Sequence, residues 1–271
     1  MRSMVEGASA TVAFAGAEKQ IMGLGTVVLT GGSRGIGAAI GRRLAADGYA
    51  VAVNYASDAK AAAAAVAAIE ANGGSAMAYG ADVADAAAVA RMFAQAADEL
   101  GPLAGLVNNA GSSGRFAPVA EQDPADLTRL FAVNVIGTIL CCREAVRRLS
   151  TKRGGAGGAI VNLSSVAARL GGLPGLAPYA ASKGAIESFT KGLATEVGPE
   201  GVRVNAVAPG MIETDMTEGL LSQAAARQRI ESGTPLGRIG APDDIAEAVA
   251  WLMSPAAGFV TGTVLTVSGG R

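Results

Sequence analysis

From Thr26 onward, short apolar segments rich in β-branched residues alternate with longer segments of helical pattern. Short, fully apolar runs are typical of strands buried in a parallel sheet, and strands joined by helices make right-handed crossovers. The alternation therefore predicts an α/β fold, a doubly wound parallel sheet of about seven strands with helices on both faces. The predicted strands are 27–29, 50–54, 76–79, 105–107, 159–161, 202–207 and 264–267, and the predicted helices are 38–47, 57–72, 85–100, 124–150, 179–197 and 242–254.

The domain organisation follows from what the chain lacks between these elements. No Pro- or Ser-rich linker divides residues 23–271, so we expect a single domain. Residues 211–240, with Thr, Gly, Pro and charged residues, are expected to be irregular or briefly helical and to form a mobile substrate lid. Residues 1–22 fit no element and are predicted to be a disordered extension or the product of a misassigned start site.

Composition excludes several classes of chemistry. The chain has no histidine, which removes Ser-His-Asp and Cys-His nucleophiles and the common histidine metal sites. Its only cysteines, Cys141 and Cys142, are adjacent and lack metal-ligand spacing, so we predict buried packing, no metal and a reducing cytoplasm. The 22 basic and 23 acidic residues give no case for nucleic acid or an anionic membrane, and no apolar run reaches about 18–20 residues.

A glycine-rich turn follows the first predicted strand. Gly31, Gly35 and Gly37 stand at the junction where that strand enters the first helix. Such a turn presents backbone N–H groups and the positive end of a helix to a pyrophosphate, although glycine-rich turns also simply cap helices. The spacing differs from the Gly-x-Gly-x-x-Gly of the common dinucleotide fingerprint. The position in a βαβ pattern nevertheless predicts a dinucleotide site.

The end of the second predicted strand bears on which dinucleotide binds. NAD-binding sheets carry an acidic residue there that hydrogen-bonds the ribose hydroxyls, but this chain has Asn54, with Asp58 further along the turn. The missing carboxylate and Arg34 in the glycine turn suit a 2′-phosphate, so we predict NADP, with NAD still possible. The alternative for Arg34 is an ordinary exposed loop arginine.

The segment Pro178–Lys183 carries the candidate chemistry. Tyr179 and Lys183 are four residues apart on a predicted helix, so their side chains share one face. A neighbouring ammonium would lower the phenol pKa and make Tyr179 a usable acid/base, although such pairs are more often solvated surface residues. Ser165, or alternatively Ser164, ends a buried strand and could meet Tyr179 at the edge of the sheet.

Taken together, these motifs resemble the short-chain dehydrogenase/reductase family, which has a Rossmann-type fold. The resemblance covers nearly all of Gly25–Arg271. The motifs that carry it occur in the family's order and are Thr30–Gly37, Asp82-Val83, Asn108–Gly111, Asn134, Ser165, Tyr179–Lys183 and Pro209-Gly210.

The resemblance implies roles for these residues. Tyr179 would be the acid/base, Lys183 would lower its pKa and hold the nicotinamide ribose, Ser165 would orient the substrate carbonyl, and Asn134 would support a proton relay. Asp82 would contact adenine, Asn109 and Gly111 would border its ribose, and Thr214 would lie near the nicotinamide amide. The implied cofactor-binding set is Gly31, Ser33, Arg34, Gly35, Ile36, Gly37, Asn54, Asp82, Val83, Asn109, Ala110, Gly111, Tyr179, Lys183, Pro209, Gly210, Ile212 and Thr214.

The resulting functional hypothesis is an NADP-dependent oxidoreductase acting on CH–OH donors, which interconverts a carbonyl and a secondary alcohol of a small molecule, including sugar-type substrates. A 3-oxoacyl-(acyl-carrier-protein) reductase is the runner-up, although relatives of that type carry a basic carrier-docking residue where this chain has Glu200, with Arg153 as a partial substitute. A non-enzyme alternative is a catalytically inactive dinucleotide-sensing protein. The resemblance also implies a homotetramer or homodimer.

Overall fold

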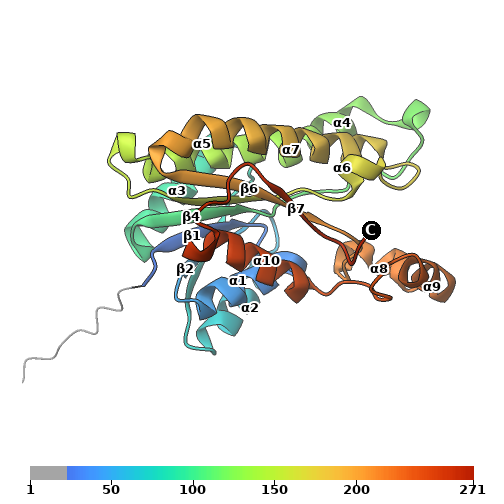
Figure 1. The fold of residues 1–271 in the computed structure, drawn as a ribbon, viewed down its shortest axis with the longest axis horizontal. Helices are drawn as coiled ribbons and strands as arrows, with labels where there is room; N and C mark the ends of the chain where they lie inside the picture. The colour runs from blue at the N-terminus through green and yellow to red at the C-terminus, as the bar shows by residue number, and fades with distance from the viewer. Residues whose placement is uncertain (1–22) are drawn as a thin grey trace, which may run out of the picture.

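The computed structural model describes residues 23–271, which form a three-layer α/β fold around one parallel sheet (Figure 1). Within these residues the sheet has seven strands in the order β3-β2-β1-β4-β5-β6-β7, which confirms the predicted fold class. The prediction for residues 1–22 lies outside the described residues. The strands are β1 (Thr26–Thr30), β2 (Ala50–Tyr55), β3 (Ser75–Gly80), β4 (Leu103–Asn108), β5 (Gly158–Leu163), β6 (Val202–Pro209) and β7 (Val264–Val267).

Helices cover both faces of this sheet (Figure 1). One layer consists of α1 (Gly35–Ala46), α2 (Ala59–Glu70) and α10 (Pro242–Met253). The opposite layer consists of α3 (Ala86–Leu100), α4 (Pro124–Phe131), α5 (Thr138–Leu149) and α7 (Ala177–Val197). The short helices α6 (Ala167–Leu170), α8 (Asp215–Leu221) and α9 (Ala224–Ser232) lie at the end of the molecule where the strands terminate, on the right in Figure 1.

The structure departs from the predicted elements at one long helix and adds detail at two other places. The predicted helix 124–150 is interrupted by a π-helical turn, Ala132–Gly137, which contains Asn134. Within this turn, a Cβ on Gly137 would lie 2.7 Å from Val83 Cγ2, so the chain passes very close to its neighbour there. Residues 211–240, predicted to be irregular or briefly helical, contain two short helices, α8 and α9, with a small apolar cluster of their own. Helix α6 had no signal in the apolar pattern because it is only four residues long.

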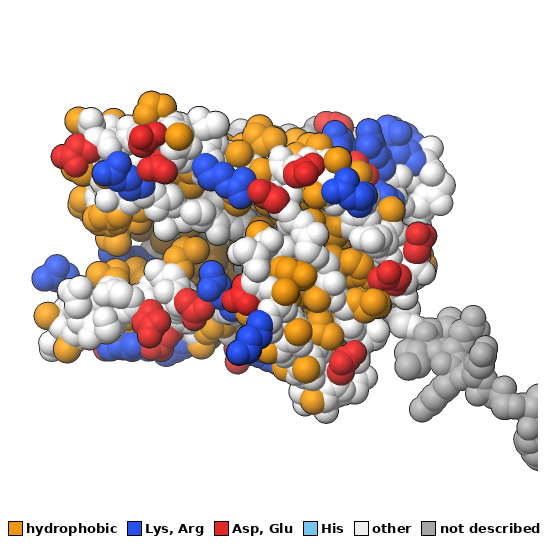
Figure 2. Space-filling view, turned by 180° about the vertical axis from the view of Figure 1, so that it is seen from behind, with side chains coloured by type: hydrophobic (Ala, Val, Ile, Leu, Met, Phe, Trp, Pro, Cys, Tyr) orange, Lys and Arg blue, Asp and Glu red, His pale blue; other side chains and the backbone are white. Residues whose placement is uncertain are grey.

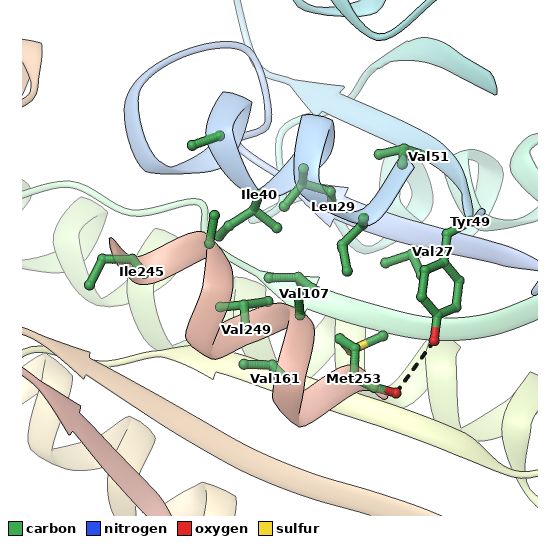
Figure 3. Close-up of a cluster of buried hydrophobic side chains, with 14 of the residues drawn as sticks. Val27, Leu29, Ile40, Tyr49, Val51, Val107, Val161, Ile245, Val249 and Met253 are labelled. Carbon is green, nitrogen blue, oxygen red and sulfur yellow. Dashed lines mark hydrogen bonds between the residues drawn. The ribbon is translucent and has the colours of Figure 1, made fainter. Parts of the chain in front are cut away.

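Two apolar cores hold the layers together. Figure 3 shows the first, where α1 and α10 pack on the sheet through Ile40, Val249 and their neighbours, and the Tyr49 hydroxyl donates to the Met253 carbonyl. The second core lies under α3, α5 and α7 and contains Phe93 and both cysteines, which are free and buried as predicted. Each fully buried Leu, Ile or Phe side chain contributes about 1.5–3 kcal/mol relative to exposure. These cores fix the strand ends that carry the site.

One helical stretch among the described residues, Pro124–Leu149, is long and apolar enough to cross a membrane by length and composition alone. Its second half packs on the sheet with Cys141, Ala145 and Leu149 buried in the second core. A core helix of this kind passes the same test, so the finding carries little weight for a membrane span.

Candidate active site

The strand order reverses between β1 and β4, and this point locates the candidate site. β1 pairs with β2 on one side and with β4 on the other, so the connections leave in opposite directions. Ligands of open α/β sheets bind at the carboxyl ends of the strands at such a switch point. A cavity of about 630 Å³ lies there. Figure 2 shows the molecule hollowed at this end, between the helix layer and the segment that carries α8 and α9.

Most of the predicted cofactor-binding residues line this cavity. Those that do are Gly31, Ser33, Arg34, Gly35, Ile36, Gly37, Asn54, Asp82, Val83, Asn109, Ala110, Gly111 and Thr214. The remaining predicted positions, Asn134, Ser165, Tyr179, Lys183, Pro209, Gly210 and Ile212, lie outside its lining. Gly111 joins the two groups, because a Cβ at that position would lie 3.4 Å from Asn134 Oδ1 and 3.5 Å from Lys183 Nζ.

The glycine turn has the shape that a dinucleotide phosphate requires. Gly31 and Gly35 have φ values of +61° and +52°, which side-chain-bearing residues rarely adopt. A Cβ on Gly37 would lie 2.2 Å from the Gly31 carbonyl oxygen. The first turn of α1 has no side-chain cap from Arg34, so its N–H groups face the cavity without an internal acceptor from that residue. The turn therefore fits a pyrophosphate bound through backbone N–H groups.

Two asparagine side chains hold the backbone of the glycine turn in place. The Asn109 side chain donates to the Gly31 carbonyl at 2.7 Å and to the Thr30 carbonyl at 3.2 Å, and thereby ties the glycine turn to the end of β4. The buried Asn54 side chain accepts from Gly31 N–H and donates to the Ala81 carbonyl at 2.9 Å. Both amides serve the scaffold of the pocket, so the predicted position of Asn54 is right while its side chain is engaged with backbone groups.

Charged pairs lie at the rim of the cavity. Arg34 and Asp215 are 3.7 Å apart and mostly exposed, and they connect the glycine turn to α8. On the opposite rim, Arg129 of α4 lies 2.9 Å from Asp82. Asp82 also accepts from Ala84 N–H within its turn. Exposed pairs of this type contribute only about 0–1 kcal/mol to stability, so they can exchange partners when a charged ligand arrives.

The acidic residue that follows β2, Asp58, lies in the turn beyond the strand end and lines the cavity. Asp58 caps α2 by accepting from Ala61 N–H at 2.9 Å. Residues Tyr55–Asp58 all line the cavity, and Ser57 is exposed there. The α3 helix is capped by Asp85, whose pKa is lowered by hydrogen bonds from Ala87 and Ala88 N–H, so Asp82 is not the cap.

Tyr179 and Ser165 meet at the carboxyl edge of the sheet. The Ser165 hydroxyl lies beside the Tyr179 phenol and acts to lower the phenol pKa, and it also accepts from Ala167 N–H at 3.1 Å. Ser164, the alternative serine, is buried and donates to the Lys183 carbonyl and to Glu187. The structure therefore selects Ser165 as the serine that faces the phenol.

The structure corrects the expectation that Lys183 gives the Tyr179 phenol a lowered pKa. The phenol pKa is raised, because burial disfavours the phenolate more than the Ser165 hydroxyl favours it. Lys183 Nζ donates to the Leu163 carbonyl at 2.8 Å and lies 5.8 Å from the centre of the Tyr179 ring. Burial lowers the pKa of this amine to about 8, so its charged form is less favoured than that of a free lysine. The amine points to the carbonyl at the end of β5.

Asn134 is held by residues that the sequence analysis did not single out. Its Oδ1 accepts from Ser112 N–H at 2.8 Å, and its Nδ2 donates to the Ser112 carbonyl and to Ser182 Oγ. Ser182 in turn donates to the Tyr179 carbonyl at 2.7 Å. Ser182 lies inside the Tyr179–Lys183 motif and Ser112 directly follows Gly111, so proximity to the motifs was the available signal.

Pro209, Gly210 and Ile212 shape the route from the sheet to α8. The Pro209 carbonyl accepts from Val166 N–H, next to Ser165. A Cβ on Gly210 would lie 2.8 Å from Ser268 Cα, so the chain is pressed against the end of β7. Ile212 is buried and forms an isolated parallel bridge with Gly240. These contacts close residues 211–240 into a loop that brings Thr214 to the cavity.

The combination of a dinucleotide-shaped cavity and a Ser–Tyr–Lys group defines an oxidoreductase of the short-chain type, and comparisons with known proteins agree. A family model described as "Enoyl-(Acyl carrier protein) reductase" matches residues 31–271. An uncharacterized oxidoreductase of Escherichia coli K12, YgfF, is 44% identical over 244 residues, which cover 90% of this chain and 98% of that protein. The chain thus belongs to the short-chain dehydrogenase/reductase family.

Two other relatives bear on function. A 3-oxoacyl-[acyl-carrier-protein] reductase of Synechocystis is 41% identical over 244 residues, covering 90% of this chain and 95% of that protein. A short-chain dehydrogenase of Burkholderia cenocepacia, whose crystal structure contains NADP, has a TM-score of 0.83 at 39% identity. That alignment covers 92% of this chain and 98% of the other.

Proposed function

We infer that the protein is an NADP-dependent reductase or dehydrogenase that interconverts a small-molecule carbonyl and a secondary alcohol. The observation that carries this proposal is that the Ser165 hydroxyl lies beside the Tyr179 phenol, near a cavity whose glycine turn fits a pyrophosphate. NADP is supported by the NADP complex of a relative that is 39% identical and by Asn54, in place of an acidic residue, at the end of β2. When bound, the nicotinamide supplies or accepts the hydride.

The residues of this chain have the following roles in the reductive direction. Ser165 and Tyr179 hydrogen-bond the carbonyl oxygen as negative charge develops, and Tyr179 donates the proton. The raised phenol pKa keeps Tyr179 protonated before reaction, which suits a proton donor. Lys183 anchors the helix of Tyr179 to the strand that leads to Ser165 through its bond to the Leu163 carbonyl, and Asn134 is linked to the Tyr179 carbonyl through Ser182.

A carrier-linked 3-oxoacyl thioester is the second candidate substrate, supported by the Synechocystis relative. Glu200 counts against this candidate, because relatives of this type carry a basic carrier-docking residue at that position. Its carboxylate accepts from Ser150 and pairs with Lys152 at 3.3 Å, and it follows the end of α7 opposite to Tyr179. A basic rim therefore persists around Glu200, with Lys152 and Arg153 exposed. We further propose a homo-oligomer, a dimer or tetramer, in the cytoplasm.

The test is a carbonyl panel of acyl thioesters, sugars, steroids and small diketones, run with NADPH and NADH. We expect NADPH-dependent turnover of at least one class and a loss of about 10²–10⁴-fold in kcat for Tyr179→Phe, with cofactor affinity nearly unchanged. An acyl thioester as the best substrate would favour the second candidate. Equal turnover by Tyr179→Phe would reject the acid/base role, and binding of NADPH without turnover of any carbonyl would favour a dinucleotide sensor.

A further inference from the structure

Three successive residues at the end of β5 each contact helix α7. The Leu163 carbonyl accepts from Lys183 Nζ at 2.8 Å. The Ser164 hydroxyl lies 3.3 Å from the Lys183 carbonyl and 3.1 Å from Glu187 Oε1. The Ser165 side chain lies beside the Tyr179 phenol. The strand end and the helix are therefore joined by a row of contacts, of which the contact between Ser165 and Tyr179 is the last.

Glu187 occupies a special place in this row. It lies one helical turn after Lys183, as Lys183 lies one turn after Tyr179, so the three side chains share one face of α7. Its side chain is only 12% exposed. Ser164 donates to Oε1, while Oε2 lies 3.5 Å from Arg169 Nε. A largely buried carboxylate at this position is costly without a cation, and Arg169 supplies one.

Arg169 extends the row to the edge of the sheet. It belongs to α6, four residues after Ser165, and its guanidinium donates to Thr266 Oγ1 at 2.9 Å. Its NH2 also lies 3.5 Å from the Val264 carbonyl on β7. The segment from Ser165 to Arg169 is thus held at both ends, by Tyr179 at one end and by Glu187 and β7 at the other. The function described above does not use either charged residue.

We propose that Glu187 and Arg169 are positioning residues that hold the Ser165 hydroxyl against the Tyr179 phenol. The inference rests on the proposed function, because it assigns these residues to the same reaction. Neither residue touches the reacting atoms. They act on the separation of two groups whose alignment decides the rate, and a displacement of about 1 Å at such a site can cost about 10²-fold.

The kinetic experiment compares Glu187→Ala, Arg169→Ala and the double variant with the wild type on its best carbonyl substrate. Glu196→Ala is the matched control, since Glu196 is an exposed glutamate on the same helix. We expect kcat to fall about 10–100-fold in each single variant, with KM for NADPH within about twofold. The double variant should be no slower than the slower single variant, because both substitutions break one connected unit.

Two further measurements separate positioning from a general loss of structure. Glu187→Gln keeps an acceptor for Ser164 but loses the charge, so its kcat should lie between wild type and Glu187→Ala. The basic limb of the kcat–pH profile should move to higher pH in Glu187→Ala, because the phenol loses the neighbouring serine hydroxyl that acts to lower its pKa. A kcat within twofold of wild type in both Ala variants, or fully additive losses, would overturn the proposal.

A crystal structure of Glu187→Ala provides a result that does not depend on turnover. We expect the Ser165 hydroxyl to lie farther from the Tyr179 phenol than it does in a crystal structure of the wild type, whereas the glycine turn is unchanged. An unmoved Ser165 would overturn the positioning role even if no carbonyl in the panel were a substrate. Absence of wild-type turnover would instead count against the proposed function alone, so the two failures are distinguishable.

Discussion

The two halves of the candidate site differ in the parts of the chain that form them. The half at the ends of β1 and β2 is made of backbone: glycines approach one another where no Cβ would fit, and the charged side chains around them are exposed. The half at the ends of β4 and β5 is made of buried side chains. Asn134, Ser164 and Lys183 are each at most 6% exposed, and each is hydrogen-bonded.

This difference follows from what each half must do. A phosphate is recognised by a concave surface of N–H groups, and rim charges can exchange their partners at little cost. Proton transfer instead depends on the separation of a few atoms, which buried and fully satisfied hydrogen bonds can hold fixed. Substitutions in the first half should therefore act mainly on cofactor binding, and those in the second half on kcat.

The largest effect should come from Lys183→Met, which tests the side-chain half. We expect kcat to fall about 10²-fold or more, since the amine that anchors α7 to the strand end is lost, while NADPH affinity changes much less. Stopped-flow turnover and fluorescence titration of NADPH measure the two quantities. An equal loss in both would show that the two halves are not separable.

The same variant has a pH signature in stability. The pKa of Lys183 is about 8 in the folded protein and 10.5 for the free amine. Between pH 8 and 10.5 the unfolded chain binds more protons than the folded protein, so this residue makes the free energy of unfolding rise with pH. Below pH 8 the amine is charged in both states, and the full cost of burying the charge is present. The difference in unfolding free energy between wild type and Lys183→Met should shift by about 1–2 kcal/mol in favour of wild type from pH 8 to 9.5. A pH-independent difference in urea unfolding would contradict the assignment.

Gly37→Ala tests the backbone half. Its added Cβ would lie 2.2 Å from the Gly31 carbonyl oxygen and 2.7 Å from Asn109 Nδ2, so the turn must move. We expect a loss of about 1–3 kcal/mol of stability and at least a tenfold rise in the Kd for NADPH. Gly192→Ala is the control, because nothing lies within 4 Å of its added Cβ in α7. That variant should gain about 0.5–1 kcal/mol with unchanged Kd.

The same contrast explains how much the sequence could predict. The strands, the glycine turn and the position of Tyr179 and Lys183 on one helix face are local patterns. The structure confirms the fold, and in it the glycine turn lines the cavity at the strand ends. The π-helical turn around Asn134 had no such pattern, because it depends on a close approach to Val83 from another element. For residues 211–240 the sequence predicted irregular or briefly helical structure, and Thr, Gly and Pro in the flanks left the bounds of α8 and α9 undefined.

The electrostatics of Tyr179 could not be predicted either. Spacing along a helix shows that an amine is one turn away, but it does not show where the amine points or how deeply the phenol is buried. Burial raises the pKa of Tyr179, and Lys183 is directed at the Leu163 carbonyl. Similarly, Asn54 stands where predicted, and only the structure shows its amide engaged by Gly31 and Ala81.

Arg34→Ala should have the smallest effect. It tests whether the half of the site at the ends of β1 and β2 determines the preference for NADPH over NADH. Arg34 is exposed, lines the cavity and faces Asp215 at 3.7 Å, an interaction weak enough for a cofactor phosphate to replace. We expect the Kd for NADPH to rise about tenfold, or about 1.4 kcal/mol, and that for NADH about twofold, because only NADPH carries the 2′-phosphate. Asp215→Asn, which removes the competing carboxylate, should lower the Kd for NADPH slightly. Equal losses for both cofactors would assign Arg34 to the shared pyrophosphate, and no loss for either would leave it an ordinary loop arginine.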